Sequence, residues 1–399
     1  MVTQVHPQNL TVPLESVKGR IRVLHIVENL NSQAVESWLL RVLRASRQDY
    51  PQLEWTFFCV LGREGRLDDL ARSLGAEVIH SRYEVGDKVR FVRSLREVMK
   101  RGRYDILHCH HDVMSAAYLL ASQGLPFQKR IVHVHNTSLS LPTPNRLKAD
   151  LAREPMRQMC LRMADQIVGI SKEALESMVG NSETDPERHR IVHYAVDTDS
   201  FSRVRIDREG FRKDLGFGPG AKVLLFVGRV VSYKNPCFVL EILEQLLTIR
   251  PDVVAVFAGA GNQLEEILEV ARRRSLESRV RLLGFRDDVP ELMANSDVLI
   301  WPSLEKPKEG LGLGIIEAQA AGLAIIMSRS VPPEAIVVPD LVDVLPLSVG
   351  AEEWSGRVSE ILDRTRSGRE QSRARVETSS FSMAEGVRNI ISLYNKALR

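Results

Sequence analysis

Short apolar runs alternate with amphipathic helical stretches along most of this 399-residue chain. Strands of near-continuous apolar character, separated by helices, are typical of right-handed βαβ units and of a parallel sheet that is covered on both faces. In the first half of the chain, strands are expected at residues 21–27, 55–61, 77–80, 104–109, 130–135 and 166–170.

The same alternation begins again after Phe201. Residues 203–220 are charged and contain glycine, which is typical of a boundary between domains. New strands are expected at residues 222–228, 253–258, 280–283, 298–301 and 324–327. Length agrees with this reading, because a single core rarely grows past roughly 250–300 residues.

We therefore predict an α/β fold with two Rossmann-like, doubly wound parallel-sheet domains, and a ligand where the C-terminal ends of the strands face each other across a cleft. The expected parts are a flexible leader over 1–19, an N-terminal domain over 20–202, a C-terminal domain over 203–382 and a final helix over 383–399.

Composition excludes several classes of protein. The chain has no run of about 18 or more apolar residues, so no transmembrane helix is expected. Residues 1–20 lack the apolar core of a signal peptide. The net charge of +3 is too small to argue for nucleic acid. The four cysteines are scattered and mostly lie inside apolar runs, which favours reduced thiols and a cytoplasmic location.

A glycine-rich segment separates two glutamates, Glu309 and Glu317. Glycines at alternate positions let a backbone approach a ligand closely, and the following helix, expected at 315–321, offers free N–H groups to a phosphate. Ionised carboxylates accept hydrogen bonds from sugar hydroxyls. The segment therefore suits a nucleotide sugar, although an ordinary loop with solvated glutamates explains these residues equally well.

A pair of cations follows the first strand of the second domain. Gly228 ends that strand, and Arg229 and Lys234 come next, before Asn235-Pro236 opens a helix. Arg can grip a phosphate bidentately and Lys adds a point charge, so the pair could neutralise a departing nucleoside diphosphate. The alternative is two solvated surface cations.

Histidines close two neighbouring strands of the first domain. His108 and His110 end one strand, and His133 and His135 end the other. The strand period of two puts each pair on one face, with His110 and His135 outermost. Adjacent parallel strands do not give the usual tetrahedral ligand spacing, so no metal is predicted. The inner two are expected to be hydrogen-bonded in a packed layer, and His135 is the candidate for a sugar contact.

In their order and spacing these residues resemble the family-four retaining glycosyltransferases of the GT-B fold, and within them the EpsF-type branch that builds bacterial exopolysaccharide or capsule. The resemblance runs from Arg20 nearly to the end of the chain. Its motifs are Trp301-Pro302-Ser303, Glu309-Gly310-Leu311, the run 317–323, Gly228-Arg229, Lys234-Asn235, His135-Asn136-Thr137, Ser171-Lys172-Glu173-Ala174, Val196-Asp197 and Phe201.

The resemblance implies a role for each site residue. Glu317 would accept the ribose hydroxyls, and Glu309 would hold hydroxyls of the donor sugar. Arg229 and Lys234 would bind the diphosphate, and His135 would contact the 6-hydroxyl region of the sugar. Further donor-binding residues would be Gly228, the backbone of Gly312, Leu313, Gly314 and Ile315, and Arg286 in a loop against the base.

It also implies retention of anomeric configuration, by front-face attack with the leaving phosphate as base. No bound metal and no cofactor would be needed besides the donor substrate, a UDP-sugar. The final helix would cross back onto the first domain.

Three places depart from the family pattern. The usual Gly-Gly of the first βα loop is replaced by Gln33-Ala34, which makes these two, with His110, candidates for acceptor or loop contacts. An Asn-Gly pair is replaced by Tyr194-Ala195. An insertion at 305–308 makes Glu305 a rival of Glu309, which we prefer because it keeps the spacing to Glu317.

Basic residues crowd the helical stretch 87–101, with apolar residues between them. Such a helix can rest on anionic lipid. The alternative is a solvated outer face whose apolar side covers the sheet.

The predicted function is a hexosyltransferase that uses a nucleotide sugar and a glycan or lipid-linked acceptor. It would lie in the cytoplasm or at the inner face of the cell membrane, and no nucleic acid partner is expected. Two alternatives stay open: a non-catalytic nucleotide-sugar-binding subunit, and an epimerase or phosphorylase of the same fold.

Overall fold

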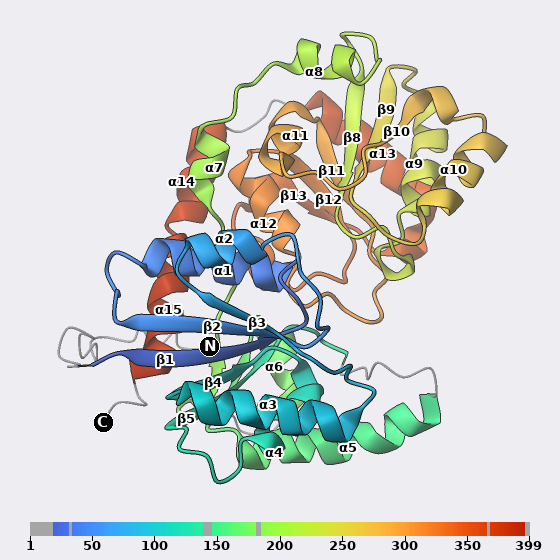
Figure 1. The fold of residues 1–399 in the computed structure, drawn as a ribbon. Helices are drawn as coiled ribbons and strands as arrows, with labels where there is room; N and C mark the ends of the chain where they lie inside the picture. Colours follow the sequence, from blue (N-terminus) through green and yellow to red (C-terminus); the bar gives the residue numbers. More distant parts are fainter. Residues whose placement is uncertain (1–18, 32–33, 139–145, 181–184, 365–367, 396–399) are drawn as a thin grey trace. The chain divides into compact units, whose positions relative to one another are not determined.

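The computed structural model describes residues 19–31, 34–138, 146–180, 185–364 and 368–395, and it divides into two compact units. The first unit extends to His193 and resumes at Ala384, and the second comprises Tyr194–Met383. Each unit contains one sheet whose strands are all parallel (Figure 1). This confirms the α/β class and the two Rossmann-like domains. The expected leader lies outside the described residues, apart from Gly19.

The first unit has a seven-stranded sheet in the order β3-β2-β1-β4-β5-β6-β7. The last strand, β7, was not predicted, because its three residues form no apolar run. The strands are β1 (Ile21–Val27), β2 (Leu53–Cys59), β3 (Glu77–His80), β4 (Ile106–Cys109), β5 (Lys129–Val134), β6 (Gln166–Gly169) and β7 (His189–Ile191).

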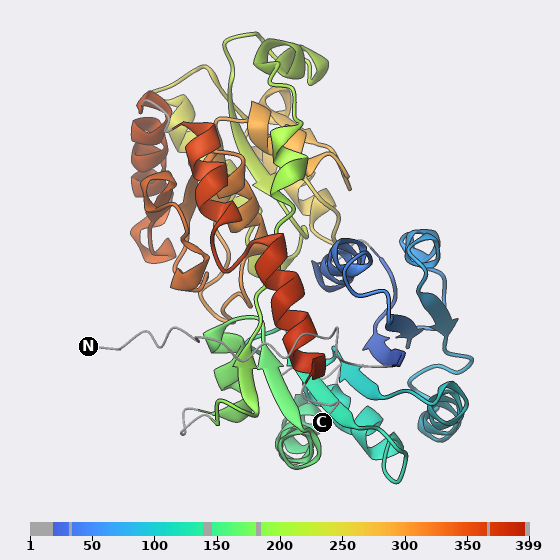
Figure 2. The same ribbon diagram turned by 90° about the vertical axis from the view of Figure 1, so that its left-hand side faces the viewer.

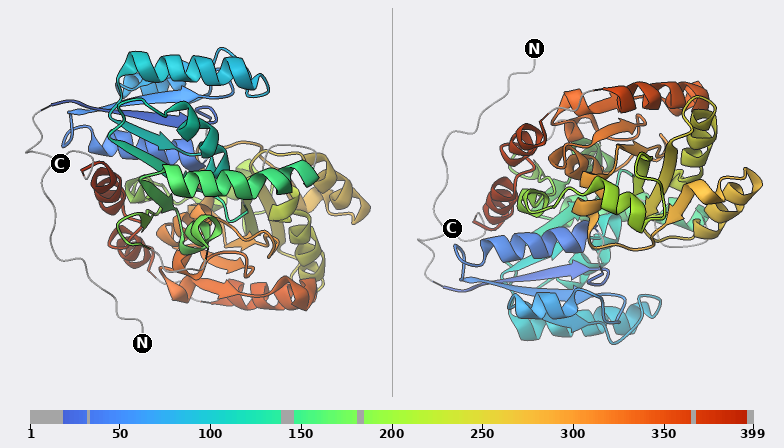
Figure 3. Two further views of the ribbon diagram at one scale, coloured as in Figure 1. Left: turned by 90° about the horizontal axis from the view of Figure 1, so that it is seen from below. Right: turned by 90° about the horizontal axis from the view of Figure 1, so that it is seen from above.

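Helices cover both faces of this sheet. The Trp38 ring of α1 (Ala34–Ser46) packs edge-on against His133 on one face. On the other face, Phe91 of α3 (Lys88–Gly102) packs against Phe58 and Tyr118. The strands lie between α1 and α3 in Figures 1 and 3. The other helices of this unit are α2 (Asp68–Ser73), α4 (Ser115–Ala121), α5 (Arg146–Met163) and α6 (Lys172–Val179).

The last helix of the chain, α15 (Met383–Asn395), packs in the first unit (Figure 2). Near its end, the buried Lys129 ammonium of β5 donates to the carbonyl of Leu393 at 2.6 Å. The Tyr394 hydroxyl lies 3.0 Å from His108 Nδ1 of β4. These contacts place the end of α15 on the same face of the sheet as α1.

The second unit has a six-stranded sheet in the order β10-β9-β8-β11-β12-β13. The bounds of β9, β11 and β12 are those expected, whereas the short β13 was not predicted. The strands are β8 (Lys222–Val227), β9 (Val253–Ala258), β10 (Val280–Leu282), β11 (Val298–Trp301), β12 (Ala324–Met327) and β13 (Val342–Val344).

The core of the second unit packs the sheet against three helices, through residues such as Phe226, Phe257 and Trp354. Those helices are α9 (Cys237–Leu247), α10 (Leu264–Arg273) and α13 (Gly350–Asp363). The others are α7 (Thr198–Ser202), α8 (Arg208–Asp214), α11 (Val289–Asn295), α12 (Leu313–Ala320) and α14 (Arg369–Glu377). No helix in the described ranges has both the length and the apolar character needed to cross a membrane.

Candidate functional site

The carboxylate of Glu309 lies buried in the loop between β11 and α12, where three side chains donate to it. The Lys234 ammonium lies 2.6 Å from Oε1 and 2.7 Å from Oε2. Oε1 also accepts from the Ser303 hydroxyl at 2.5 Å and from the Trp301 indole at 3.1 Å. The structure therefore brings two predicted site residues, Glu309 and Lys234, into direct contact.

Burial and mutual attraction have opposite effects on the pKa values of Glu309 and Lys234. Burial raises the pKa of Glu309, but Lys234 and the other donors outweigh it, so the pKa lies below its ordinary value. Burial lowers the pKa of Lys234, while Glu309 opposes that change. The ammonium also lies 4.4 Å from the Trp301 ring centroid, a cation–π contact. Glu309 is therefore ionised at neutral pH and held by a buried cation.

The glycine-rich loop leading into α12 requires glycine at two positions. Gly312 has φ +80°, a left-handed conformation that favours glycine. A Cβ on Gly314 would lie 2.8 Å from the Trp301 ring. The loop thus packs its backbone against the indole that also bonds Glu309.

Helix α12 begins at Leu313, earlier than predicted. The Ile315 N–H, offered by the sequence as a phosphate donor, instead donates to the Gly312 carbonyl at 2.9 Å. The first-turn donors that suit a phosphate are then the N–H groups of Leu313 and Gly314. Glu317 lies on the same helix and is partly buried.

Arg229 and Arg286 lie in loops of the same unit, after β8 and β10 respectively. Arg229 follows Gly228 at the end of β8, is exposed, and donates to the Tyr233 hydroxyl. The Lys234 ammonium lies 5.5 Å from the centroid of the Tyr233 ring. Tyr233 therefore lies beside both cations. Arg286 is paired with Asp288 in its own loop, with Nε 2.7 Å from Oδ1.

The sequence missed Tyr233 and Ser303 as contributors to this cluster. Both follow the carboxyl ends of strands that are neighbours in the sheet, β8 and β11. Position at this edge of a parallel sheet was the signal that could have found them.

The rival glutamate of the insertion lies elsewhere. Oε1 of Glu305 accepts from the Leu347 N–H at 3.3 Å. Glu305 thus bonds the backbone ahead of α13, whereas Glu309 bonds Lys234. This difference favours Glu309 as the first glutamate of the motif.

The two outer histidines of the first unit bond each other. His110 Nδ1 lies 3.0 Å from His135 Nε2, and His110 Nε2 lies 3.1 Å from Nδ1 of His25. Both ring nitrogens of His110 are therefore engaged, which makes this acceptor candidate a part of the packing. His135 is 7% exposed, and its backbone N–H donates to Asp112 at 2.8 Å.

The inner histidines, His108 and His133, are also hydrogen-bonded to each other. His108 Nε2 lies 3.2 Å from His133 Nδ1, and His108 Nδ1 bonds the Tyr394 hydroxyl. That hydroxyl also lies 3.5 Å from His25 Nε2. Burial lowers the pKa of His25 and His133 to about 3. It also holds the pKa of His108, His110 and His135 well below the ordinary value. All these rings are neutral at pH 7.

Two histidine trios have nitrogens within 4.8 Å of one another, close enough to hold a metal ion: His25, His108 and His110, and His110, His133 and His135. The same nitrogens pair with each other as hydrogen bonds. The absence of a metal stays a prediction.

The altered first βα loop is only partly described, because Gln33 lies outside the described residues. Ala34 is exposed and begins α1. Glu36 is buried, and its burial raises the pKa to about 8. This carboxyl is therefore largely protonated at neutral pH.

Two family models match the chain in succession. Residues 22–200 match the model described as Glycosyltransferase Family 4, and residues 207–377 match that described as Glycosyl transferases group 1. A Bacillus subtilis protein named "Putative glycosyltransferase EpsF" is 26% identical over 376 residues, covering 94% of this chain and 96% of the relative.

An Escherichia coli UDP-Gal:alpha-D-GlcNAc-diphosphoundecaprenol alpha-1,3-galactosyltransferase is 24% identical over 328 residues, covering 79% of this chain and 81% of the relative. Among solved structures, Anabaena Alr3699/HepE in complex with UDP-glucose matches with a TM-score of 0.77 and 17% identity. That match covers 94% of this chain and 100% of the other. Together the two family models cover most of both units, and the chain belongs to the glycosyltransferases of GT-B fold that they describe.

Proposed function

We propose that this chain is a retaining, metal-independent glycosyltransferase that moves a hexose from a UDP-sugar to a glycan or lipid-linked acceptor in polysaccharide or glycoconjugate biosynthesis. The observation that carries the proposal is the buried Glu309–Lys234 pair beside the glycine-rich start of α12. The UDP-glucose complex of the Anabaena protein and the UDP-Gal donor in the name of the E. coli relative support the choice of UDP.

The contacts of Glu309 suggest how donor binding begins. An ionised carboxylate offers about four acceptor sites, and Glu309 already accepts from Lys234, Ser303 and Trp301. Oε1 has three of these donors and Oε2 has only Lys234, so two sugar hydroxyls on Oε2 need the acceptor site that Lys234 now occupies. We infer that the diphosphate draws the Lys234 ammonium away and frees Glu309 for the sugar.

We assign the other site residues the roles that the family resemblance implies. Arg229 joins Lys234 on the diphosphate, and Leu313 and Gly314 add N–H donors. Glu317 accepts the ribose hydroxyls, Arg286 lies by the base, and His135 contacts the sugar. The cations stabilise the charge that develops on the leaving diphosphate, and that diphosphate serves as the base for the acceptor hydroxyl.

A panel of UDP-, GDP- and ADP-sugars, incubated with the wild-type protein with and without a lipid-diphosphate sugar acceptor, tests this function. We expect consumption of one UDP-sugar only when acceptor is present, with the α configuration of the donor kept in the product. UDP binding without turnover of any donor would favour a non-catalytic subunit. An altered sugar or a sugar phosphate without acceptor would favour an epimerase or phosphorylase.

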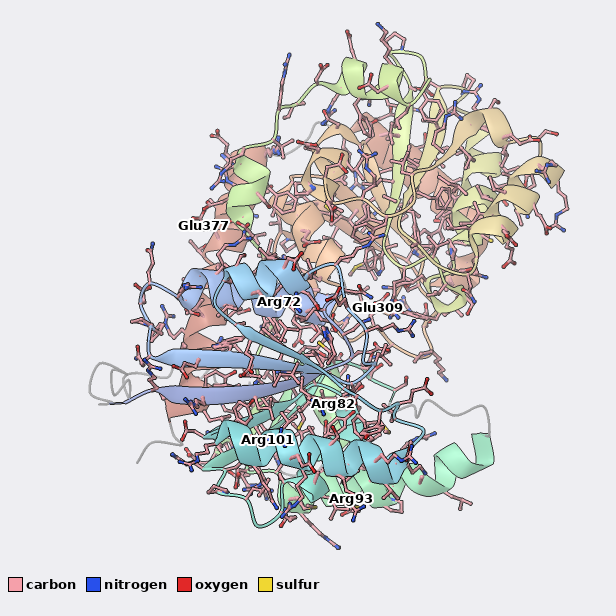
Figure 4. The ribbon with its side chains drawn as sticks, viewed as in Figure 1. Arg72, Arg82, Arg93, Arg101, Glu309 and Glu377 are labelled. Carbon is pink, nitrogen blue, oxygen red and sulfur yellow. The ribbon has the colours of Figure 1, made fainter. Side chains whose placement is uncertain are left out.

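A lipid-linked acceptor would bring the protein to the inner face of the membrane, and α3 is the candidate contact. Its apolar side is packed, because Phe91, Leu95 and Met99 are buried. Its basic side is exposed and includes Arg93 and Arg101, which are labelled in Figure 4. The two alternatives from the sequence, a helix that covers the sheet and a helix that rests on anionic lipid, are therefore compatible. The apolar side of α3 covers the sheet, and its basic side remains exposed.

Replacing Arg90, Arg93 and Lys100 by Ser should weaken binding to vesicles with anionic lipid by about 100-fold, because each cation near the surface contributes about 1 kcal/mol. Arg96 is left unchanged, since it donates to the carbonyls of Ala121 and Gln123. Vesicle co-sedimentation measures the effect. Serine at three exposed cations elsewhere, Lys213, Arg272 and Arg273, is the matched control. Equal losses in both triple variants would contradict a role for α3.

A further inference from the structure

A thiol, a carboxylate and an imidazole meet in the first unit, at residues that the proposed function does not use. Cys59, Asp68 and His80 each offer one ligand atom, and these atoms lie within 4.8 Å of one another. We call the three residues the Cys–Asp–His cluster. All of them belong to the first unit, so their arrangement does not depend on the second unit.

Three elements of secondary structure bring the cluster together. Cys59 ends β2 and His80 ends β3, and the two residues are register partners in the parallel pair. Register partners point to the same face of a sheet, on strands about 4.8 Å apart. Asp68 begins α2, and its Oδ2 lies 2.7 Å from Nε2 of His80. The cluster is therefore built into the ends of two strands and the start of a helix.

Two atoms of the cluster lack a hydrogen bond. Oδ1 of Asp68 accepts from the Gly65 N–H at 3.2 Å, whereas Oδ2 faces His80. The contact between Oδ2 and Nε2 does not have hydrogen-bond geometry, and among the described residues neither atom has another hydrogen-bond partner. The Asp68 side chain is only 4% exposed. Buried polar atoms without a hydrogen-bond partner are rare, and an ion held between them satisfies both.

The ligand types of the cluster suit zinc. Thiolate, imidazole and carboxylate all bind Zn²⁺, whereas a thiolate is a poor ligand for Mg²⁺ or Ca²⁺. Burial raises the pKa of the Cys59 thiol to about 12, so the thiol gives its proton to solvent only as the ion binds. Thiolate and carboxylate together then balance the two charges of the ion. Three protein ligands leave the fourth tetrahedral position to water.

The surroundings of the cluster allow an ion to enter. Zinc with bonds of about 2.0–2.1 Å holds its nitrogen and oxygen ligands about 3.3 Å apart, so Oδ2 and Nε2 must separate by about 0.6 Å. The His80 side chain is 20% exposed, so its ring has room to turn. Arg72 lies 3.5 Å from Oδ2 and opposes a cation, but its guanidinium also pairs with the exposed Asp69 at 3.1 Å.

We propose that Cys59, Asp68 and His80 bind a Zn²⁺ ion that fastens α2 and the loop before it, residues 60–67, to the ends of β2 and β3. The ion stabilises this part of the first unit and takes no part in sugar transfer. The proposal therefore goes beyond the proposed function and does not depend on it.

Cobalt titration of the full-length protein, first treated with a chelator, tests the site. Co²⁺ bound to a thiolate gives a charge-transfer band in the near ultraviolet. We expect one equivalent of Co²⁺ to produce this band and Zn²⁺ to abolish it. The two histidine trios contain no sulfur, so an ion bound there gives no such band. Metal binding without the band, or no binding at all, would overturn the proposal.

Removal of one ligand should weaken Zn²⁺ binding by about 100-fold or more, because loss of even an outer-shell partner costs about 10–100-fold. The variants are Cys59→Ala and His80→Phe, and competition with a coloured chelator measures the affinity. His80 is partly exposed, so His80→Phe serves as the test if Cys59→Ala does not fold. Cys237→Ala, at a partly buried thiol of the second unit, is the matched control and should bind Zn²⁺ normally. Wild-type affinity in His80→Phe would exclude the site.

Hydrogen exchange measures whether the ion fastens the loop and α2. With free Zn²⁺ at about 100 times Kd, exchange of amides in residues 60–71 should slow by up to about 100-fold, since the ion binds only the closed form. Exchange in β9 of the second unit should stay the same. Equal exchange in residues 60–71 with and without Zn²⁺ would contradict the stabilising role. UDP binding, measured with and without chelator, should not change, and a protein that binds zinc but no nucleotide sugar would defeat the proposed function alone.

Discussion

Substitution of Glu309 by Gln should lower turnover of the nucleotide sugar by about 100-fold or more, since hydrogen bonds to charged groups contribute about 1.5–3 kcal/mol each and the sugar would lose two. The amide would also turn donor hydrogens toward the Lys234 ammonium, which lies 2.6 Å from the present carboxylate. Turnover with saturating acceptor, measured over a range of donor concentrations, gives the effect on kcat and KM.

The same change should destabilise the free protein. Breaking one side of a buried ion pair costs roughly 3–5 kcal/mol, and the Lys234 and Glu309 side chains are only 11% and 8% exposed. Urea unfolding must therefore accompany the kinetics, at a temperature where the variant stays folded. Lys234→Met breaks the pair from the other side. It should weaken UDP binding, whereas Glu309→Gln should leave UDP binding nearly unchanged.

Glu305→Gln is the control for position and charge, because Glu305 bonds the Leu347 backbone instead of Lys234. It should keep wild-type turnover. If Glu305→Gln were inactive and Glu309→Gln active, the two glutamates would have to exchange roles. If both variants were fully active, the site assignment itself would fail.

Glu317→Ala should weaken UDP binding by about 10- to 100-fold, because a carboxylate that accepts ribose hydroxyls contributes about 1.5–3 kcal/mol. Glu317 lies in the second turn of the short helix α12, which begins at the glycine-rich loop, and is partly buried. Calorimetry with UDP, GDP and ADP measures the loss and identifies the base as well.

A modified ligand makes this test sharper. The wild type should bind 2′-deoxy-UDP more weakly than UDP, and Glu317→Ala should bind the two nearly equally, since the second change removes a contact already lost. Glu353→Ala, an exposed acid in the first turn of α13, is the control and should bind UDP normally. A variant of Glu317 that still prefers UDP over the deoxy form would exclude the ribose contact.

The strands that were predicted correctly are those marked by a local run of apolar residues. The strands 253–258, 298–301 and 324–327 match β9, β11 and β12 because an unbroken run of four to six apolar residues indicates burial without reference to any partner. The strands that were missed, β7 and β13, have three residues each at sheet edges, and their pairing depends on a neighbouring strand.

Local patterns in the sequence predict the two parallel sheets, the glycine-rich loop and the residue types of the site, because apolar periodicity and turn chemistry act over a few neighbouring residues. The contact partners of these site residues depend instead on how the chain packs. Lys234 meets Glu309 across 75 positions of sequence, and Tyr394 meets His108 across 286. Such contacts depend on strand order and helix docking, which no local pattern encodes. That is why Glu309 and Lys234 were each predicted as ligand-binding residues, while their contact with each other was not.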